Sequence, residues 1–579
     1  MKFELQKGSR SKILAAIMFV VMAAFVARLF YLQIIRHDYY VQIGNAEQVK
    51  RLKIPAKRGL IYALDGNTPA PLVMNQTIYT VFADPQTVKD NSKIVDVIRQ
   101  VAGGNARPNL ESLLGKKDSR YQILATKITR TQADKIKAEN LKGIGFQEGT
   151  ERVYPEGGLA AQVLGFVDYE GVGKYGVESK LNDRLTGVDG LLQSVTDVSD
   201  VPLTIGNNNI NKPAVNGENV VLSIDRNIQS HVEQALADSI KKSGVDKGSV
   251  VVMNPQNGKI LAMANLPSYE VANFDKVQDA SAFNNATVSD PYEPGSDIKT
   301  LTMATGIDKG VVAPDSTFDN NDYIKIDDRV IWNYSRGHIG RLTFQEGLNY
   351  SLNTAFVNVV QRLGDGNNIT REARDTLYDY FHNKFLLGQK TGVELANEED
   401  GTIISPEEAD GNAVRYSNMA FGQGMDITMV QVASAFCSLI NGSNYYKPTI
   451  LAGYLDEKGK FNEKNTTVFS HPVSVSTANQ MRDMVHITRN NLFGNLDKQG
   501  YYIGGKTGTS DVIKNGVYTS DESIATYLGY GGTKELSQYV IMVRVSGKNK
   551  AMFGSTNASP IFTDISNWML DYLKIQPKG

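Results

Sequence analysis

The stretch GSVVVMNPQNGKILAMA, residues 248–264, predicts two β-strands joined by a tight turn. Its two halves are rich in β-branched and apolar residues, and the PQNG between them favours a hairpin turn. A second pair of apolar runs occupies residues 524–530 and 539–545, and a helical pattern follows at 560–573. Helical segments fill the region between the two pairs. We therefore predict an α+β fold in which one antiparallel sheet is built from both ends of a domain and is covered by helices.

The 579 residues of the chain exceed what one hydrophobic core usually serves, so at least two domains are expected. Residues 220–224 predict a strand, and Asp225 is placed to cap the helix that follows. A polar, turn-rich linker at 207–213 precedes that strand. We therefore predict a non-catalytic pedestal of mixed α/β structure at 36–217 and a catalytic domain at 218–579.

Residues 13–35 are almost wholly apolar, and as a helix they are long enough to cross a bilayer core of about 30 Å. Lysines and an arginine precede this run, so the positive-inside rule predicts that residues 1–12 form a cytoplasmic tail. Arg28 lies close enough to the outer end for its guanidinium to reach the membrane interface. A cleaved signal peptide is the alternative, but no small-x-small site closes the run. We expect a single-pass anchor in the cell membrane and an extracytoplasmic catalytic domain.

The composition argues against several classes of protein. The formal net charge is -1, so the basic surplus that a nucleic-acid partner usually requires is missing. Cys437 is the single cysteine and lies in an apolar stretch, where we expect a buried side chain rather than a catalytic thiol. The six histidines are dispersed without metal-ligand spacing, so neither a metal site nor a zinc peptidase is predicted.

Three short elements follow one another in the second half of the chain: SDIK at 296–299, SLN at 351–353 and KTGT at 506–509. Together they supply the groups that attack on an amide carbonyl needs. Their order is informative because each pattern is weak by itself. Partial copies occur at Ser9 with Lys12, Ser239 with Lys242, 390–392 and 555–557. These copies differ in order or in context, so we assign the chemistry to the ordered set.

The first element predicts a nucleophile and its base. Residues three apart share a face of a helix, so the Lys299 amine is expected to lie over the Ser296 hydroxyl. Burial lowers the pKa of a lysine, and a neutral amine accepts the serine proton as a general base. The backbone N–H groups of Ser296 and Thr509 are the expected oxyanion hole.

The other two elements predict groups that act on the substrate. Ser351 would relay a proton to the leaving amine, and the Asn353 amide would bind both a lysine and the substrate backbone. A helix cap is the alternative for this pair. KTGT is expected on a strand edge, where Gly508 lets an extended peptide approach and add as a strand. The groups expected to bind a substrate carboxylate there are Lys506, Thr507 and Thr509.

With these elements the chain resembles the class B, monofunctional penicillin-binding proteins, the D,D-transpeptidases that cross-link peptidoglycan. The resemblance runs almost end to end. Asp297 and Ile298 depart from the family's usual residues inside the first element, and Ala63 stands where the pedestal often has aspartate. The further stretches that carry the resemblance are KRGLIY at 57–62, DG at 65–66, RVYP at 152–155, GKYGVE at 173–178, LTG at 185–187, YEPGS at 292–296 and FGQG at 421–424.

The resemblance implies that Ser296 is acylated by a stem peptide with release of D-alanine and that a neighbouring stem's amine resolves the acyl-enzyme. It implies Lys299 as the base, Ser351 and Asn353 as the proton-relay pair, and no cofactor. β-Lactams would mimic the donor and trap Ser296. The implied partner is a membrane-embedded glycan polymerase, and the implied role is cell wall biogenesis in division or in the maintenance of cell shape.

Two alternatives of different kinds stay open. A D,D-carboxypeptidase or β-lactamase shares the three elements but passes the acyl group to water. A non-catalytic β-lactam sensor or scaffold would retain the site and act through partners. Product analysis with a peptidoglycan acceptor distinguishes transpeptidation from the hydrolysis of the first alternative. Retention of function after Ser296→Ala would favour the second alternative.

Overall fold

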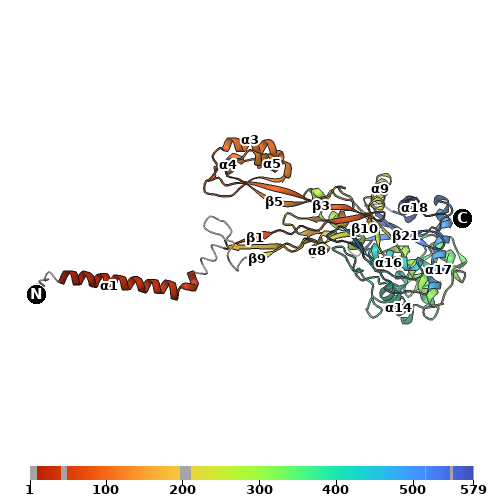
Figure 1. Ribbon diagram of the computed structural model, residues 1–579. Helices are drawn as coiled ribbons and strands as arrows, with labels where there is room; N and C mark the ends of the chain where they lie inside the picture. The colour runs from red at the N-terminus through yellow and green to blue at the C-terminus, as the bar shows by residue number, and fades with distance from the viewer. Residues whose placement is uncertain (1–8, 41–48, 196–209, 515–516, 548–551, 578–579) are drawn as a thin grey trace. The chain divides into compact units, whose positions relative to one another are not determined.

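The computed structural model describes residues 9–40, 49–195, 210–514, 517–547 and 552–577 (Figure 1). Residues 1–8 of the expected tail and 207–209 of the expected linker lie outside the described residues. The structure divides into two compact units, one formed by 1–58 with 186–217 and the other by 59–185 with 218–579. Residues of the expected pedestal therefore contribute to both units.

The first unit contains the apolar N-terminal helix. Helix α1 spans Ser9–Phe30 and continues into a short π-helix, η1, at Tyr31–Ile35. Within the described part of the chain, Arg10–Ile35 is the one helical segment long and apolar enough to cross a membrane. The predicted helix over 13–35 is therefore confirmed. The same unit holds an antiparallel three-stranded sheet of β1 (Val49–Ile54), β8 (Gly190–Val195) and β9 (Ile210–Lys212).

The second unit contains a mixed sheet with the strand order β18-β17-β10-β2-β3-β4, in which β5 also pairs with β3. Strand β10 runs parallel to β2 and antiparallel to β17. Residues of the expected pedestal thus share one sheet with residues 451–463 of the expected catalytic domain. The strands are β2 (Ile61–Asp65), β3 (Thr68–Ala83), β4 (Gln122–Thr129), β5 (Ile144–Val153), β10 (Asn219–Asp225), β17 (Leu451–Leu455) and β18 (Phe461–Glu463).

Three helices pack together beside β3, β4 and β5 around a hydrophobic core of their own (Figure 1). They are α3 (Asn91–Ala102), α4 (Leu110–Gly115) and α5 (Arg130–Ala138). Helix α5 begins with a capping box, because Thr129 accepts a hydrogen bond from the Gln132 backbone while the Gln132 side chain accepts one from Thr129 N.

A five-stranded antiparallel sheet forms the centre of the expected catalytic domain, with the order β12-β11-β21-β20-β19. β11 pairs with β12 on one side and with β21 on the other, so the predicted hairpin and the joining of both ends of the domain are confirmed. β19 is an edge strand, which leaves half of its backbone groups available to an added strand. The strands are β11 (Lys247–Met253), β12 (Ile260–Leu266), β19 (Gly504–Lys514), β20 (Val517–Gly532) and β21 (Ser537–Ser546).

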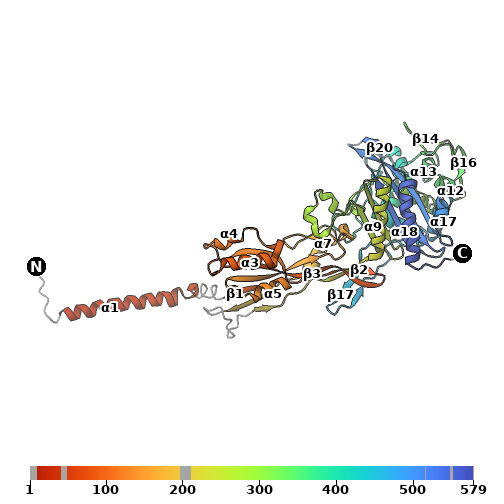
Figure 2. The same cartoon turned by 90° about the horizontal axis from the view of Figure 1, so that it is seen from above.

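Helices cover both faces of this sheet. On one face α9 (Arg226–Ser243) and α18 (Ser559–Tyr572) lie side by side (Figure 2). Asp225 caps α9 as predicted, because its carboxylate accepts hydrogen bonds from the backbone N–H groups of Asn227 and Ile228. On the other face lie α11 (Lys299–Asp308), α13 (Asn353–Arg362), α16 (Met429–Ile440) and α17 (Val475–Phe493).

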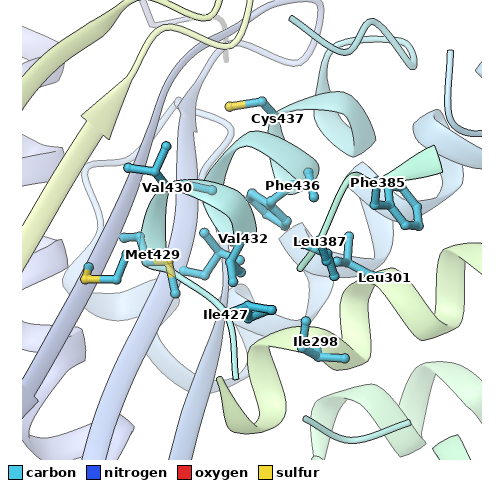
Figure 3. Packing of buried hydrophobic residues seen from close by; sticks show 14 of the residues in the cluster. Ile298, Leu301, Phe385, Leu387, Ile427, Met429, Val430, Val432, Phe436 and Cys437 are labelled. Atoms are coloured by element: carbon cyan, nitrogen blue, oxygen red, sulfur yellow. The ribbon is translucent and has the colours of Figure 1, made fainter. Parts of the chain in front are cut away.

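Helix α16 is the buried centre of that second face, because it contacts β11, β21 and α11. Figure 3 shows Ile298 and Leu301 packed in the same apolar cluster as Val432 and Phe436 of α16. Both Ile298 and Leu301 are fully buried, so the segment that carries the first predicted element is anchored in the core. Cys437 lies in α16 and is 4% exposed, which confirms the prediction of a buried side chain.

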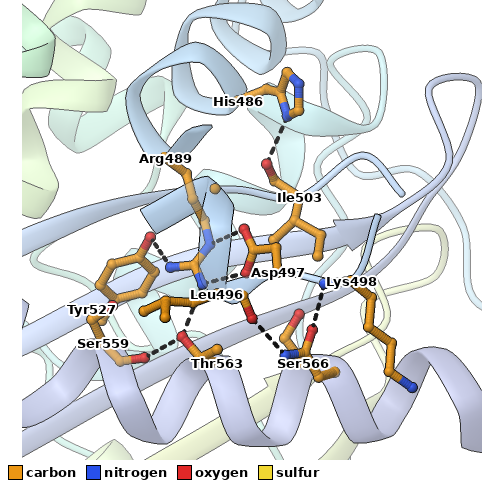
Figure 4. A network of polar contacts seen from close by, with 12 residues as sticks. His486, Arg489, Leu496, Asp497, Lys498, Ile503, Tyr527, Ser559, Thr563 and Ser566 are labelled. Atoms are coloured by element: carbon orange, nitrogen blue, oxygen red, sulfur yellow. Dashed lines mark hydrogen bonds and ion pairs between the residues drawn. The ribbon is translucent and has the colours of Figure 1, made fainter. Parts of the chain in front are cut away.

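A buried ion pair joins α17 to the sheet and to α18 (Figure 4). The guanidinium of Arg489 is fully buried and donates to both carboxylate oxygens of Asp497, at 2.8 Å and 2.6 Å. It also donates to the Tyr527 hydroxyl at 2.6 Å and to the Thr563 hydroxyl at 2.9 Å. The planar fork of arginine therefore satisfies groups from three elements at once.

We expect Arg489→Met to destabilise the full-length protein by about 3–5 kcal/mol, because it leaves the Asp497 carboxylate buried without its counter-ion. Urea or thermal unfolding of the detergent-solubilised protein measures the change. The matched control is Arg371→Met, since Arg371 pairs with Asp375 at 2.7 Å on an exposed helix face and such pairs contribute less than about 1 kcal/mol. Equal losses in the two variants would contradict the importance of the buried network.

Candidate active site

The three predicted elements meet at one cavity of about 300 Å³. Of the predicted site residues, Ser296, Lys299, Ser351, Asn353, Thr507 and Thr509 line it. Lys506 and Gly508 are buried beside the cavity and do not line it. The other lining residues are Tyr334, Ser335, Tyr350, Phe421, Gln423, Asp511, Phe553, Gly554 and Ser555.

Ser296 lies on a tight turn rather than in an α-helix. A 3-10 helix, η5, spans Gly295–Ile298, and α11 begins at Lys299. The α-helix expected to carry both Ser296 and Lys299 therefore begins only at Lys299, and Ser296 precedes it on the 3-10 turn. Gly295 has φ +62°, and a Cβ built on it would lie 2.7 Å from the Thr509 carbonyl oxygen, so the turn packs directly on β19. Positions three apart eclipse in a 3-10 helix, which keeps Ser296 and Lys299 on one side.

The Lys299 amine is held by the second element. The side chain is 1% exposed, and Nζ lies within hydrogen-bond distance of the Ser351 carbonyl oxygen at 2.7 Å, Ser351 Oγ at 3.1 Å and Asn353 Oδ1 at 2.8 Å. Burial lowers the pKa of Lys299 well below its usual value, and the charge of Lys506 lowers it further. A neutral amine at this position is the form that accepts a proton.

The Ser296 hydroxyl is half-buried and makes no hydrogen bond to the part of the chain that the structure describes. Lys299 is bonded to Ser351 and Asn353 instead. Catalytic hydrogen bonds are often long in a substrate-free site and shorten when substrate binds. Ser296 is thus free to rotate toward Lys299 or toward a substrate carbonyl.

The Ser351 hydroxyl lies between two amines. Its Oγ is 3.1 Å from Lys299 Nζ and 2.9 Å from Lys506 Nζ. Ser351 has φ +56°, a left-handed conformation that is uncommon outside glycine and that here sets the side chain between the two lysines. The bridge gives a proton a short path between Lys299 and Lys506.

Asn353 is the first residue of α13, and its side chain does not cap that helix. Its Oδ1 accepts from Lys299, and its Nδ2 donates to the Trp332 carbonyl at 2.9 Å. The residue before α13, Leu352, makes no side-chain capping bond. The amide therefore orients the buried amine, and the helix-cap alternative is not observed.

β19 forms the third wall of the cavity. Successive side chains of a strand alternate between its faces, so Thr507 and Thr509 face the cavity while Lys506 and Gly508 face the interior. Lys506 Nζ donates to the Thr507 carbonyl at 2.8 Å as well as to Ser351. Burial lowers the pKa of Lys506 to about 8. Lys506 itself does not line the cavity, and its hydrogen bond to Ser351 connects it to the residues that do.

Exposed aromatic side chains surround the mouth of the cavity and were missed by sequence reasoning. Tyr334 is 80% exposed, and its ring centroid lies 6.1 Å from that of Phe553. Tyr350 stacks on His338 at 4.1 Å. These residues come from separate loops with no shared spacing, so no local pattern could have identified them. Ser555, part of the rejected copy at 555–557, also lies at this rim.

The copy at 390–392 lies away from the cavity. Lys390 is exposed, and the Thr391 hydroxyl and N–H both donate to Glu398 Oε1. The copy at Ser239 and Lys242 lies on α9, on the opposite face of the sheet. Neither copy lines the cavity.

Comparisons with known proteins identify the family of the chain. The family described as penicillin binding protein transpeptidase domain matches residues 248–567, and the penicillin-binding protein dimerisation domain matches 53–222. The chain is 28% identical to stage V sporulation protein D of Bacillus subtilis, over 98% of this chain and 87% of that protein. It is 26% identical to the probable peptidoglycan D,D-transpeptidase PenA of Neisseria meningitidis, over 98% of this chain and 94% of that protein.

A solved structure shares the fold as well. Penicillin binding protein 2X from Streptococcus thermophilus superposes with a TM-score of 0.74 at 22% identity, covering 91% of this chain and 80% of that one. Because the transpeptidase match spans more than half of the chain and is preceded by the dimerisation match, the family is established. The chain belongs to the class B penicillin-binding proteins.

Proposed function

We propose that this chain is a peptidoglycan D,D-transpeptidase that cross-links stem peptides through an acyl-enzyme on Ser296. The observation that carries the proposal is the buried Lys299 amine, whose pKa is lowered and which shares one cavity with the half-buried Ser296 hydroxyl. The edge strand β19 closes the same cavity and offers free backbone groups to an extended peptide.

Acylation begins when the donor stem peptide adds along β19. Ser296 Oγ attacks the carbonyl of the D-Ala-D-Ala bond, and its proton passes to neutral Lys299 Nζ. The backbone N–H groups of Ser296 and Thr509 stabilise the oxyanion, a contribution of about 3 kcal/mol per donor. The C–N bond then breaks, and the leaving D-alanine amine takes a proton through the Ser351 hydroxyl. The product is a Ser296 ester.

Resolution of the ester reverses these roles. The amine of a second stem attacks the ester carbonyl and loses a proton to Lys299, and Ser296 leaves as the hydroxyl. A new amide joins the two stems. β-Lactams would form the same ester by ring opening, and because their leaving group stays attached the ester persists.

The remaining parts of the chain are proposed to place this site outside the membrane. Helix α1 with η1 would anchor the chain, and the positive residues before it would keep the N-terminus cytoplasmic. We assign 36–217 as the pedestal and 218–579 as the transpeptidase domain, with a membrane-embedded glycan polymerase as the partner. The mixed sheet joins 59–185 to the catalytic region within one unit, which would transmit a load on the pedestal to the head.

A reaction with a donor stem pentapeptide and a separate amine acceptor tests the activity. We expect D-alanine and a cross-linked dimer in equal amounts, measured by liquid chromatography and mass spectrometry. Shortened donor without dimer, at saturating acceptor, would favour the carboxypeptidase alternative. Unchanged donor together with retained penicillin labelling would favour a sensor.

A further inference from the structure

Asp297, the residue after the proposed nucleophile, has a buried carboxyl group in an unusual environment. It is fully buried, and neither of its carboxyl oxygens has a hydrogen-bond partner among the described residues. Isolated buried carboxylates are strongly disfavoured, so such a group is retained only where its charge or its proton has a use. The mechanism proposed above does not use it.

The Asp297 carboxyl lies beneath β19 on the Lys506 side. A Cβ built on Gly508 would come within 3.0 Å of Asp297 Oδ1 and 2.1 Å of Thr526 Oγ1. The carboxyl therefore sits against the backbone of the KTGT element, beside the Thr526 hydroxyl. Residues two apart lie on the same face of a strand. The Lys506 side chain therefore lies on the same face of β19 as Gly508, the face nearest Asp297.

The charged and titratable groups around Asp297 come from several elements. Lys506 of β19 is the cation that acts on it electrostatically, and Lys299 of α11 is the next buried amine. Arg544 of β21 is engaged elsewhere, because its guanidinium donates to Asp290 at 2.5 Å and lies 4.3 Å from the centroid of the Tyr292 ring. The tyrosines nearby are Tyr292, just before η5, and Tyr527 of β20, and both stay neutral because burial raises their pKa.

We propose that Asp297 is a positioning residue for acylation, whose carboxylate holds Lys506 as the protonated amine and so leaves Lys299 as the neutral amine that takes the Ser296 proton. The inference rests on the proposed function and deepens it. It assigns the charges of the site: the Asp297 carboxylate and the Lys506 ammonium interact electrostatically, and the second amine, Lys299, is left uncharged. The Ser351 hydroxyl bridges the two amines and would carry a proton from one to the other.

The direction of the coupling follows from the charges. The Asp297 carboxylate raises the pKa of Lys506 against the effect of burial, and the Lys506 charge lowers the pKa of Lys299. Burial raises the pKa of Asp297 itself to about 7. Without the carboxylate, Lys506 loses its proton at a lower pH, and Lys299 then competes for that proton. Acylation should therefore decline earlier on the alkaline side.

The test is the pH profile of acylation of the full-length protein by benzylpenicillin. In Asp297→Asn we expect the alkaline limb of the second-order rate constant to move down by about one to three pH units, since a nearby opposite charge shifts a pKa by that amount. The isosteric control is Thr526→Val, which keeps the carboxyl group and removes only the neighbouring hydroxyl that favours its ionised form, so its limb should move less than that of Asp297→Asn. In a Lys506→Arg background Asp297→Asn should leave the limb in place, because arginine stays protonated.

A merely structural role gives a different result. If Asp297→Asn lowers the rate equally at every pH and the limb stays in place, the inference is overturned. Stoichiometric labelling at pH 6 verifies the folded site, and Asp297→Ser replaces the asparagine variant if that variant does not label. Wild-type protein that takes no penicillin on Ser296 would overturn the proposed function itself, which is a distinguishable outcome.

Discussion

Ser296→Ala should abolish covalent labelling by penicillin and the formation of cross-linked dimer, while the thermal stability of the protein stays unchanged. The hydroxyl makes no hydrogen bond within the described chain, so its removal leaves no buried partner unsatisfied. It is also the one hydroxyl of the first element on the same side as the buried Lys299 amine. Intact-protein mass spectrometry followed by peptide mapping measures the adduct.

The control for this experiment is Ser555→Ala, at the rim of the same cavity. Ser555 lies on η8 (Gly554–Ala558) and is exposed. We expect full labelling of this variant, with the adduct on Ser296. An adduct on the Ser296→Ala protein, whether on Ser351, Ser335 or Ser555, would refute the assignment of the nucleophile.

Lys299→Met should slow acylation by about 10²–10⁴-fold, the range that a general base contributes, without moving the site of the adduct. Methionine keeps the unbranched apolar stem that is buried at this position and removes only the amine. The Ser296 proton then has no acceptor of suitable pKa. Time courses with a fluorescent penicillin give the rate, and a long incubation shows whether the same serine is eventually labelled.

The matched control is Lys390→Met, in the copy of the KTG pattern that lies on an exposed loop. Its acylation rate should equal that of the unchanged protein. A wild-type rate in Lys299→Met would show that another group takes the proton, and Lys506, joined to Lys299 through Ser351, would then be the group to replace next.

The parts of the fold that were predicted from sequence are those decided by local patterns. The strands over 248–264 and 524–545 were recognised because each is a short apolar run bounded by turn residues. The mixed sheet was not recognised, because β10 pairs with β17 more than two hundred residues away and with β2 from the expected pedestal. Pairing over such distances leaves no signal in either strand.

The same distinction applies to the site. The ordered motifs located the groups around the cavity, because the chemistry requires those residue types. The 3-10 turn at Ser296 was not anticipated, since it packs closely on β19, and the left-handed backbone of Ser351 has no local sequence signal. Asp297 stood out in the sequence as a departure, but its burial against Gly508 could only be learned from the structure.

Cys437 gives the protein a practical property. The chain has one thiol, it is 4% exposed in α16, and burial raises its pKa, so maleimides and other thiol-directed reagents will not modify the native protein. A cysteine introduced at Tyr334 would be the only site to carry a fluorophore or a spin label. The environment of the cavity mouth beside Phe553 can then be compared spectroscopically before and after penicillin is added.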